Sequence, residues 1–141
     1  MPDAHDVIRR LVEDVYGERK VELVDELAHE DYYETPMPEG FSPDREGLKS
    51  VVQALHAALS DVEAQVERVL VDDGQVAWRW RMTGRHTGEF MGIPATGNPI
   101  ETTGNDVAVL REGKLETRWC EQDQLSLMIQ IGAIDLSTSP T

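Results

Sequence analysis

The strongest constraint on the fold of this chain is a change in the spacing of its apolar residues near the middle of the sequence. Up to residue 59, apolar side chains recur every three or four positions, which is the period of an amphipathic helix. From residue 62 onward they recur largely at every second position, the period of a strand with one buried face. Helices followed by strands predict an α+β domain in which the helices cover one face of a sheet.

The first half is predicted to contain three helices and one small strand. Apolar residues from Val7 to Val15 form the stripe of the first helix, with Asp3 as a suitable N-cap. We expect a first helix that stops at Gly17, a second over 21–28, a strand over 31–35, a loop over 36–40 and a third helix that opens at Ser42 and Pro43.

The second half is predicted to form an antiparallel sheet and a final helix. Trp78, Trp80 and Met82 alternate with Arg79 and Arg81, so one face of that strand should be apolar. We expect the sheet to curve strongly and to wrap around the helices, which leaves a pocket between the sheet and the helices. The expected strands cover 62–71, 76–84, 100–110 and 115–122, with a Gly/Pro-rich loop over 86–99, a short helix over 124–131, one domain over 1–133 and a tail over 134–141.

Charge limits the classes of partner. The chain has 27 acidic and 13 basic residues, a net charge of −14, which argues against nucleic acid and anionic membranes as partners. Residues 1–73 carry 19 acidic and 7 basic side chains, so most of the excess belongs to the helical half and is predicted to be solvated surface. No run of 18 apolar residues and no apolar leader occur, so we expect a cytoplasmic protein.

A set of ordered motifs resembles one known family. Residues 84–97 read G-R-H-T-G-E-F-M-G-I-P-A-T-G, and G-N-D follows at 104–106. E-G-K-L at 112–115, W-C-E-Q-D at 119–123 and L-M-I-Q-I-G at 127–132 complete the series. Together they resemble the SnoaL-like polyketide cyclases, relatives of ketosteroid isomerases and nuclear transport factor 2.

The resemblance implies an α+β cone that encloses an apolar pocket. It also implies that a polyketide-like small molecule binds there and that its ring closes by an intramolecular aldol condensation without cofactor or metal. Other members of the superfamily open epoxides, form pyrans, isomerise, resemble hydroxylases or bind ligands without catalysis, so these functions stay open as alternatives. The resemblance further suggests a homo-oligomer, a dimer or tetramer, with the outer face of the sheet as the expected dimer contact.

Asp123 is the first candidate for acid–base catalysis, because it holds the acidic position of the W-x-x-x-D motif. Ring closure needs a proton removed from a carbon between carbonyls and returned to the new alkoxide. An apolar pocket raises the pKa of a carboxyl group and so makes it useful for both steps. The alternative is that Asp123 caps the helix that follows it.

Polar residues on the other strands are the remaining catalytic candidates. Asn105 could donate to an enolate oxygen, and His86 could orient the substrate. Asp106 and Glu121 could bind substrate or, with Asp123, divide the roles of acid and base. For each of them a structural role is the alternative.

Large side chains near these residues could form the wall of the pocket, although core packing would also explain them. The predicted substrate contacts are Trp80, Met82, Phe90, Met91, Tyr33 and Trp119. The histidines lack ligand spacing and Cys120 is the single cysteine, so no metal site and no intrachain disulfide are expected.

Overall fold

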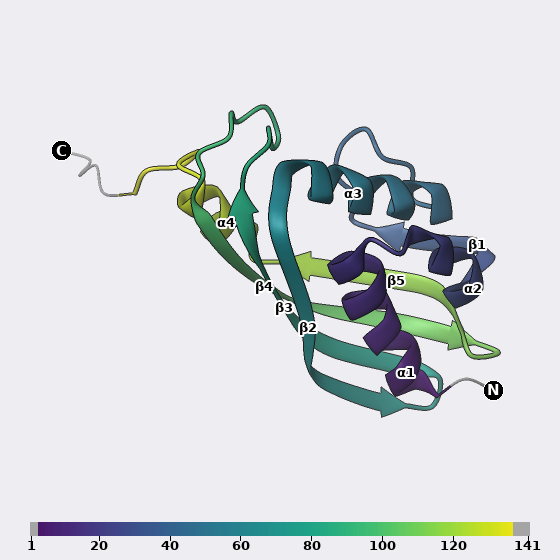
Figure 1. The fold of residues 1–141 in the computed structure, drawn as a ribbon. Coiled ribbons are helices and arrows are strands. Elements are labelled where there is room, and N and C mark those ends of the chain that lie inside the picture. The colour runs from purple at the N-terminus through teal and green to yellow at the C-terminus, as the bar shows by residue number, and fades with distance from the viewer. Residues whose placement is uncertain (1–2, 137–141) are drawn as a thin grey trace.

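The computed structural model describes residues 3–136 and shows helices packed on one face of a five-stranded sheet (Figure 1). The strand order is β1-β5-β4-β3-β2. The strands are β1 (Ala28–Thr35), β2 (Leu59–Asp72), β3 (Gln75–His86), β4 (Pro99–Arg111) and β5 (Lys114–Gln122). The predicted α+β cone architecture is confirmed.

The first helix begins where the sequence predicts. The side chain of Asp3 accepts a hydrogen bond from the backbone N–H of His5 at the start of α1 (Ala4–Arg9). The helix continues as η1 (Arg10–Gly17), which is wound as a π-helix. Its apolar stripe is buried against the sheet, with Ile8 and Val15 fully inaccessible. A short 3-10 turn, η2 (Val21–Leu23), and α2 (Val24–Leu27) then lead into β1.

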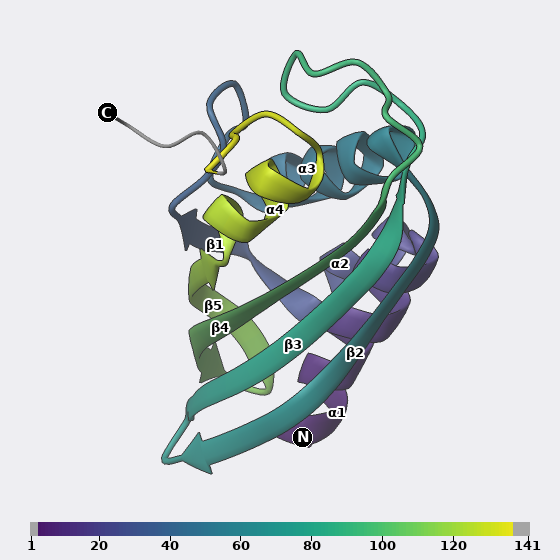
Figure 2. The ribbon, with the colours of Figure 1, turned by 90° about the vertical axis from the view of Figure 1, so that its left-hand side faces the viewer.

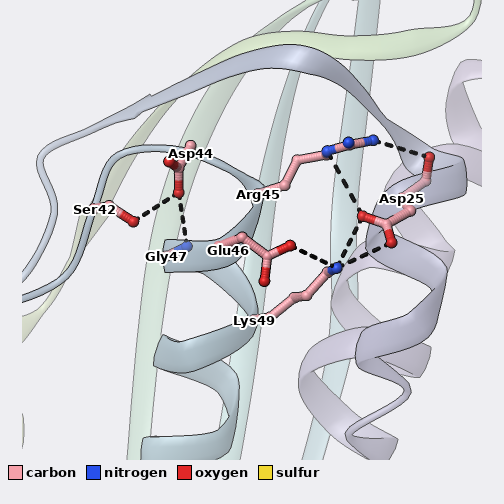
Figure 3. A network of polar contacts seen from close by, with 7 residues as sticks. All are labelled: Asp25, Ser42, Asp44, Arg45, Glu46, Gly47 and Lys49. Carbon is pink, nitrogen blue, oxygen red and sulfur yellow. Dashed lines mark hydrogen bonds and ion pairs between the residues drawn. The ribbon is translucent and has the colours of Figure 1, made fainter.

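The third helix, α3 (Arg45–Ala58), starts two residues later than the sequence suggests, because Asp44 rather than Ser42 is its N-cap. The Asp44 carboxylate accepts from the Gly47 N–H at 2.9 Å and from the Ser42 hydroxyl at 2.7 Å (Figure 3). Lys49 and Arg45 in its first turns both reach Asp25 of α2 (Figure 3). These ion pairs are exposed and fix orientation more than stability.

The sheet is mixed rather than wholly antiparallel. β2, β3, β4 and β5 pair antiparallel with their neighbours, but β1 joins the edge of β5 in parallel. This arrangement follows from the chain path, because β1 enters from the helical layer and not through a hairpin.

Irregularities in the strands produce the curvature. The register of β2 against β3 shifts between Ser60 and Glu63 and again between Val66 and Arg68. Each shift inserts extra backbone into one strand, which bends it and increases the local twist. The long β2–β3 hairpin therefore curls around the helices (Figure 2).

The final helix, α4 (Gln124–Gln130), lies beyond the end of β5 and packs Leu127 into a small second core near α3. Of the predicted tail over 134–141, residues 137–141 lie outside the described residues.

Candidate active site

A cavity of about 720 Å³ lies between α3, η1 and the concave face of the sheet. Its walls are mostly apolar, and its inner end carries charged and hydroxyl groups. The segments 36–41 and 89–91 line it as well. Its side chains include Val12, Tyr16, Glu34, Phe41, Val51, Leu55, Trp78, Trp80, Met82, Phe90, Met91, Arg118, Cys120 and Glu121.

Arg118 is the centre of the polar end of the cavity. Its Nε donates to Asp106 at 2.9 Å, and its Nη2 lies 2.8 Å from the same Asp106 oxygen. Its Nη1 donates to the Tyr16 hydroxyl at 2.9 Å and to Glu34 at 3.2 Å. The Arg118 side chain is only 4% exposed, so these contacts replace its hydration. Burial opposes its charge, but Glu34 and the other acidic groups outweigh burial and raise the pKa of Arg118 well above its ordinary value.

Asp106 holds Arg118 in place, and a glycine makes this arrangement possible. Trp80 donates from Nε1 to the second Asp106 oxygen at 2.9 Å. The indole reaches it by lying across Gly104, where an added Cβ would come within 2.3 Å of the ring. The G-N-D motif therefore combines a close approach for Trp80 with a buried carboxylate for Arg118. Both oxygens of Asp106 are occupied, which marks it as a positioning group.

Glu34 and Tyr16 each keep one polar function available to the cavity. Oε1 of Glu34 accepts from the Tyr32 hydroxyl at 2.6 Å and from Arg118, whereas no hydrogen bond among residues 3–136 involves Oε2. Tyr16 accepts from Arg118, and its own hydroxyl proton has no acceptor within the same part of the chain. Burial raises the pKa of Tyr16 despite the opposing field of Arg118, so Tyr16 stays a hydrogen-bond donor at neutral pH.

Cys120 lies beside this network. The thiol accepts a weak contact from Arg118 Nη2 at 3.6 Å. Burial, together with Asp106 and against the field of Arg118, raises the pKa of Cys120 to about 12. A thiol that stays protonated is a poor nucleophile, so Cys120 contributes to the wall and not to covalent chemistry.

Five of the predicted substrate contacts do line the cavity. Trp80 and Met82 lie on the inner face of β3, as the alternation of that strand predicts, and the other three come from the loop after β3 and from β5. These five residues are Trp80, Met82, Phe90, Met91 and Glu121.

Three predicted residues belong to the outer face of the sheet. Asn105 is exposed, while its neighbour Asp106 points inward and is 1% exposed. Tyr33 is 50% exposed, because its neighbours Tyr32 and Glu34 take the inner positions of β1.

Trp119 was predicted to contact the substrate, but it is 44% exposed on the outer face of the sheet, and the pairing of β5 explains why. The register against β4 shifts between Leu115 and Thr117, so an extra residue in β5 reverses the alternation. Leu115 is buried, yet beyond the shift Arg118 faces inward and Trp119 outward. Strict alternation from Leu115 would have given the opposite result.

Asp123 and His86 lie outside the lining of the cavity. Asp123 is exposed and accepts from the backbone N–H of Ser126 at 3.1 Å, which is the capping alternative. His86 is fully buried, and its Nδ1 lies 2.9 Å from the Thr96 hydroxyl. Gly88 packs so closely on Ala57 that an added Cβ would lie 2.1 Å from its carbonyl oxygen. The G-R-H-T-G segment therefore anchors the 87–98 loop to the end of α3.

The sequence interpretation missed the three central residues, Tyr16, Glu34 and Arg118. Glu34 shares one face of a short strand with Tyr32, but the other face carries Asp31 and Tyr33, so both faces mix polar and aromatic residues and neither is marked as the inner one. Arg118 gave no usable signal either, because strict alternation from Leu115 places it on the outer face, and only the extra residue before Thr117 turns it inward. Tyr16 offered none, because it ends an ordinary amphipathic stripe.

Within residues 3–136, no three His, Cys, Asp or Glu side chains gather in a group that could hold a metal ion. Among the helices of that region, none has the length and apolar character to cross a membrane.

The geometry and the motifs agree with one family. The SnoaL-like polyketide cyclase family matches residues 6–131, so the chain belongs to this family. Because the family contains polyketide cyclases, which act on small polyketide-like molecules in a pocket, membership supports an enzymatic role. None of the curated protein sequences matches the chain.

Solved structures show the same fold. IdmH from Streptomyces antibioticus, assigned as a polyketide cyclase, is 29% identical, with a TM-score of 0.78 over 93% of this chain and 99% of that one. TsrD from Streptomyces laurentii is 21% identical, with a TM-score of 0.80 over 93% of each chain. AclR from Streptomyces galilaeus, assigned as a hydroxylase, is 17% identical, with a TM-score of 0.77 over 94% and 97%. At these last two identities the likeness concerns the fold alone.

Proposed function

We propose that this protein is a cofactor-independent cyclase that closes a ring in a polyketide-like substrate by an intramolecular aldol reaction. The observation that carries the proposal is the pairing of Glu34 and Tyr16 on the same nitrogen of Arg118, inside an apolar cavity. A proton acceptor, Glu34, and a hydrogen-bond donor, Tyr16, thus lie close together where a flat, apolar ligand would bind.

In this proposal Glu34 takes the role that the sequence assigned to Asp123. Its free oxygen removes a proton from a carbon between two carbonyls, and the resulting enolate carbon attacks a ketone of the same chain. Tyr16 donates its hydroxyl hydrogen bond to that ketone oxygen and stabilises the alkoxide. The proton held by Glu34 then passes to the alkoxide, so the reaction needs no other reactant.

The test uses the methyl ester of a linear tetraketide in deuterated buffer. Product formation and deuterium uptake between the carbonyls are both followed by NMR. Glu34→Gln should lower both rates by roughly a hundredfold or more, and Tyr16→Phe by roughly tenfold to a hundredfold. The control Asp123→Asn keeps the cap and should stay within about twofold. Loss of activity in Asp123→Asn, with Glu34→Gln unaffected, would contradict the assignment.

Opening of an epoxide is a second candidate, favoured by the two carboxylates that flank Arg118. Glu34 and Asp106 could act as base and acid on a water molecule and an epoxide oxygen. The occupied oxygens of Asp106 and its place behind the cavity lining favour the cyclase instead. Hydrolysis of styrene oxide that depends on Glu34, together with no ring closure of the tetraketide, would reverse this order.

We also propose that the protein dimerises through the outer face of the sheet. Trp119 of β5 pairs with Val107 of β4 and Thr35 of β1, and Tyr33 lies beside it on the same side. Trp119, Val107 and Tyr33 are 44%, 40% and 50% exposed, which is a large apolar area for a sheet face in contact with water. Sedimentation should show a dimer that Trp119→Glu converts to a monomer; a monomeric wild type would refute this contact.

A further inference from the structure

Tyr16 is the second-to-last residue of η1, and its backbone carbonyl accepts no hydrogen bond from the next turn of the chain. The amides of Lys20 and Val21 would bind the Tyr16 carbonyl in a continued α- or π-helix. They bond instead to the carbonyls of Asp14 and Arg19. The carbonyl at Tyr16 is therefore one of the free acceptors that every helix end leaves.

A histidine of α3 satisfies this carbonyl. Nε2 of His56, in the last turn of α3, lies 2.6 Å from the Tyr16 carbonyl oxygen. A carbonyl can only accept, so Nε2 carries the hydrogen and donates it. His56 is partly buried and does not line the cavity, although its neighbour Leu55 does.

Tyr16 is thus fixed at both of its ends. Arg118 donates to its hydroxyl at 2.9 Å, and His56 donates to its carbonyl at 2.6 Å. The two donors come from β5 and α3, so each fixes Tyr16 relative to a different wall of the cavity. A hydrogen-bond donor that stabilises a developing alkoxide must be held within a fraction of an ångström of its working position.

We infer that His56 is a positioning residue for catalysis, which acts by fixing the backbone of Tyr16 and so aiming its hydroxyl. This inference rests on the proposed function for its kinetic consequence, but the geometry it describes exists in the free protein. It distinguishes His56 from a histidine that only joins two helices, because its effect on catalysis must pass through the Tyr16 hydroxyl.

A double-mutant cycle tests this dependence. His56→Leu should lower the turnover of the tetraketide ester roughly tenfold with little change in KM. In a Tyr16→Phe background the same change should have almost no further effect, because the hydroxyl to be aimed is gone. His56→Gln, whose amide can donate, should recover most of the turnover, and Gln53→Leu on the exposed side of α3 is the matched control.

A second measurement separates this inference from the cyclase proposal. In protein with carbon-labelled tyrosine rings, the Tyr16 signal, assigned with Tyr16→Phe, should shift or broaden in His56→Leu and stay in place in Gln53→Leu. If the wild type lacks cyclase activity but the Tyr16 signal shifts in His56→Leu, the proposed function is refuted and the inferred fixing of Tyr16 by His56 stands. An unmoved Tyr16 signal in folded His56→Leu, or equal kinetic losses with and without the hydroxyl, overturns the inference. Should His56→Leu not fold, His56→Asn, whose shorter amide cannot reach the carbonyl, replaces it with the same expected outcomes.

Discussion

The two faces of the sheet are built from the same strands, but charged side chains are buried on one face and exposed on the other. On the inner face, Arg118 and Asp106 are almost completely buried and make several charge-assisted hydrogen bonds. On the outer face, Arg79 and Arg81 share Glu67, and all three side chains are about a third or more exposed. A buried charge depends on its partners because water cannot replace them, whereas an exposed charge loses little when its partner is removed.

The largest expected effect comes from removing the central cation. Arg118→Met leaves the buried Glu34 and Asp106 without the cation that contacts both, and should lower the free energy of unfolding by about 3–5 kcal/mol. Arg81→Met, on the outer face of β3, should cost about 1 kcal/mol or less. Urea unfolding of the two variants measures the difference; equal losses would mean that the inner network is as well hydrated as the surface.

Substitutions at the adjacent positions Gly104 and Asn105 compare the stability of the inner and outer faces of β4. Gly104→Ala places a methyl group against the Trp80 ring, and the displaced indole also loses its bond to Asp106. Overpacking of this kind should cost about 1–3 kcal/mol and change the tryptophan fluorescence. Asn105→Ala, one residue along and exposed, should change stability by about 0.5 kcal/mol or less. Thermal unfolding with fluorescence detection tests both, and a neutral Gly104→Ala would show that the indole has room to move.

Most of the fold could be predicted from the sequence, because apolar residues alternate regularly wherever the strands themselves are regular. Alternation in β3 placed Trp80 and Met82 correctly, and the caps at Asp3 and near Asp44 marked two helices. Alternation failed at β5, where the extra residue before Thr117 turns Trp119 outward. A bulge depends on how neighbouring strands pair, and that information is not local in the sequence.

The site was much harder to predict from the sequence, because its residues come from three distant segments. Tyr16, Glu34 and Arg118 meet only after η1 has packed on the sheet and β1 has joined the edge of β5 in parallel. The motifs identified the family, yet several motif residues proved structural. Gly104 admits an indole, Gly88 packs on α3 and Asp123 caps a helix. A motif marks what the fold needs as readily as what the reaction needs.

Alkaline pH should weaken the inner face selectively. Cys120 has a pKa of about 12 in the folded protein, above its ordinary value of 9.0, because burial disfavours the thiolate. The unfolded chain therefore releases this proton first, and stability falls as the pH rises from about 9 toward 12. Between pH 9 and 10 the thiol should account for about 1 kcal/mol of the loss. Urea unfolding at both pH values, with Cys120→Ala as the comparison, isolates this share; identical pH dependence in the two proteins would refute it.

The smallest effect is expected at Asp123, where β5 has ended and the chain leaves both faces of the sheet. Its carboxylate accepts one backbone N–H at the start of a seven-residue helix, whereas the buried carboxylate of Asp106 accepts from the side chains of Trp80 and Arg118. Asp123→Ala should lower the free energy of unfolding by about 0.5–1 kcal/mol, and Asp123→Asn, which can still cap, by only a few tenths. Chemical unfolding measures this, and the tetraketide assay on the same proteins completes the comparison. If Asp123→Asn kept its stability but lost turnover, the carboxylate would have a chemical role that its position as a cap does not explain, and the catalytic base would have to be sought at the end of β5 instead of on its inner face.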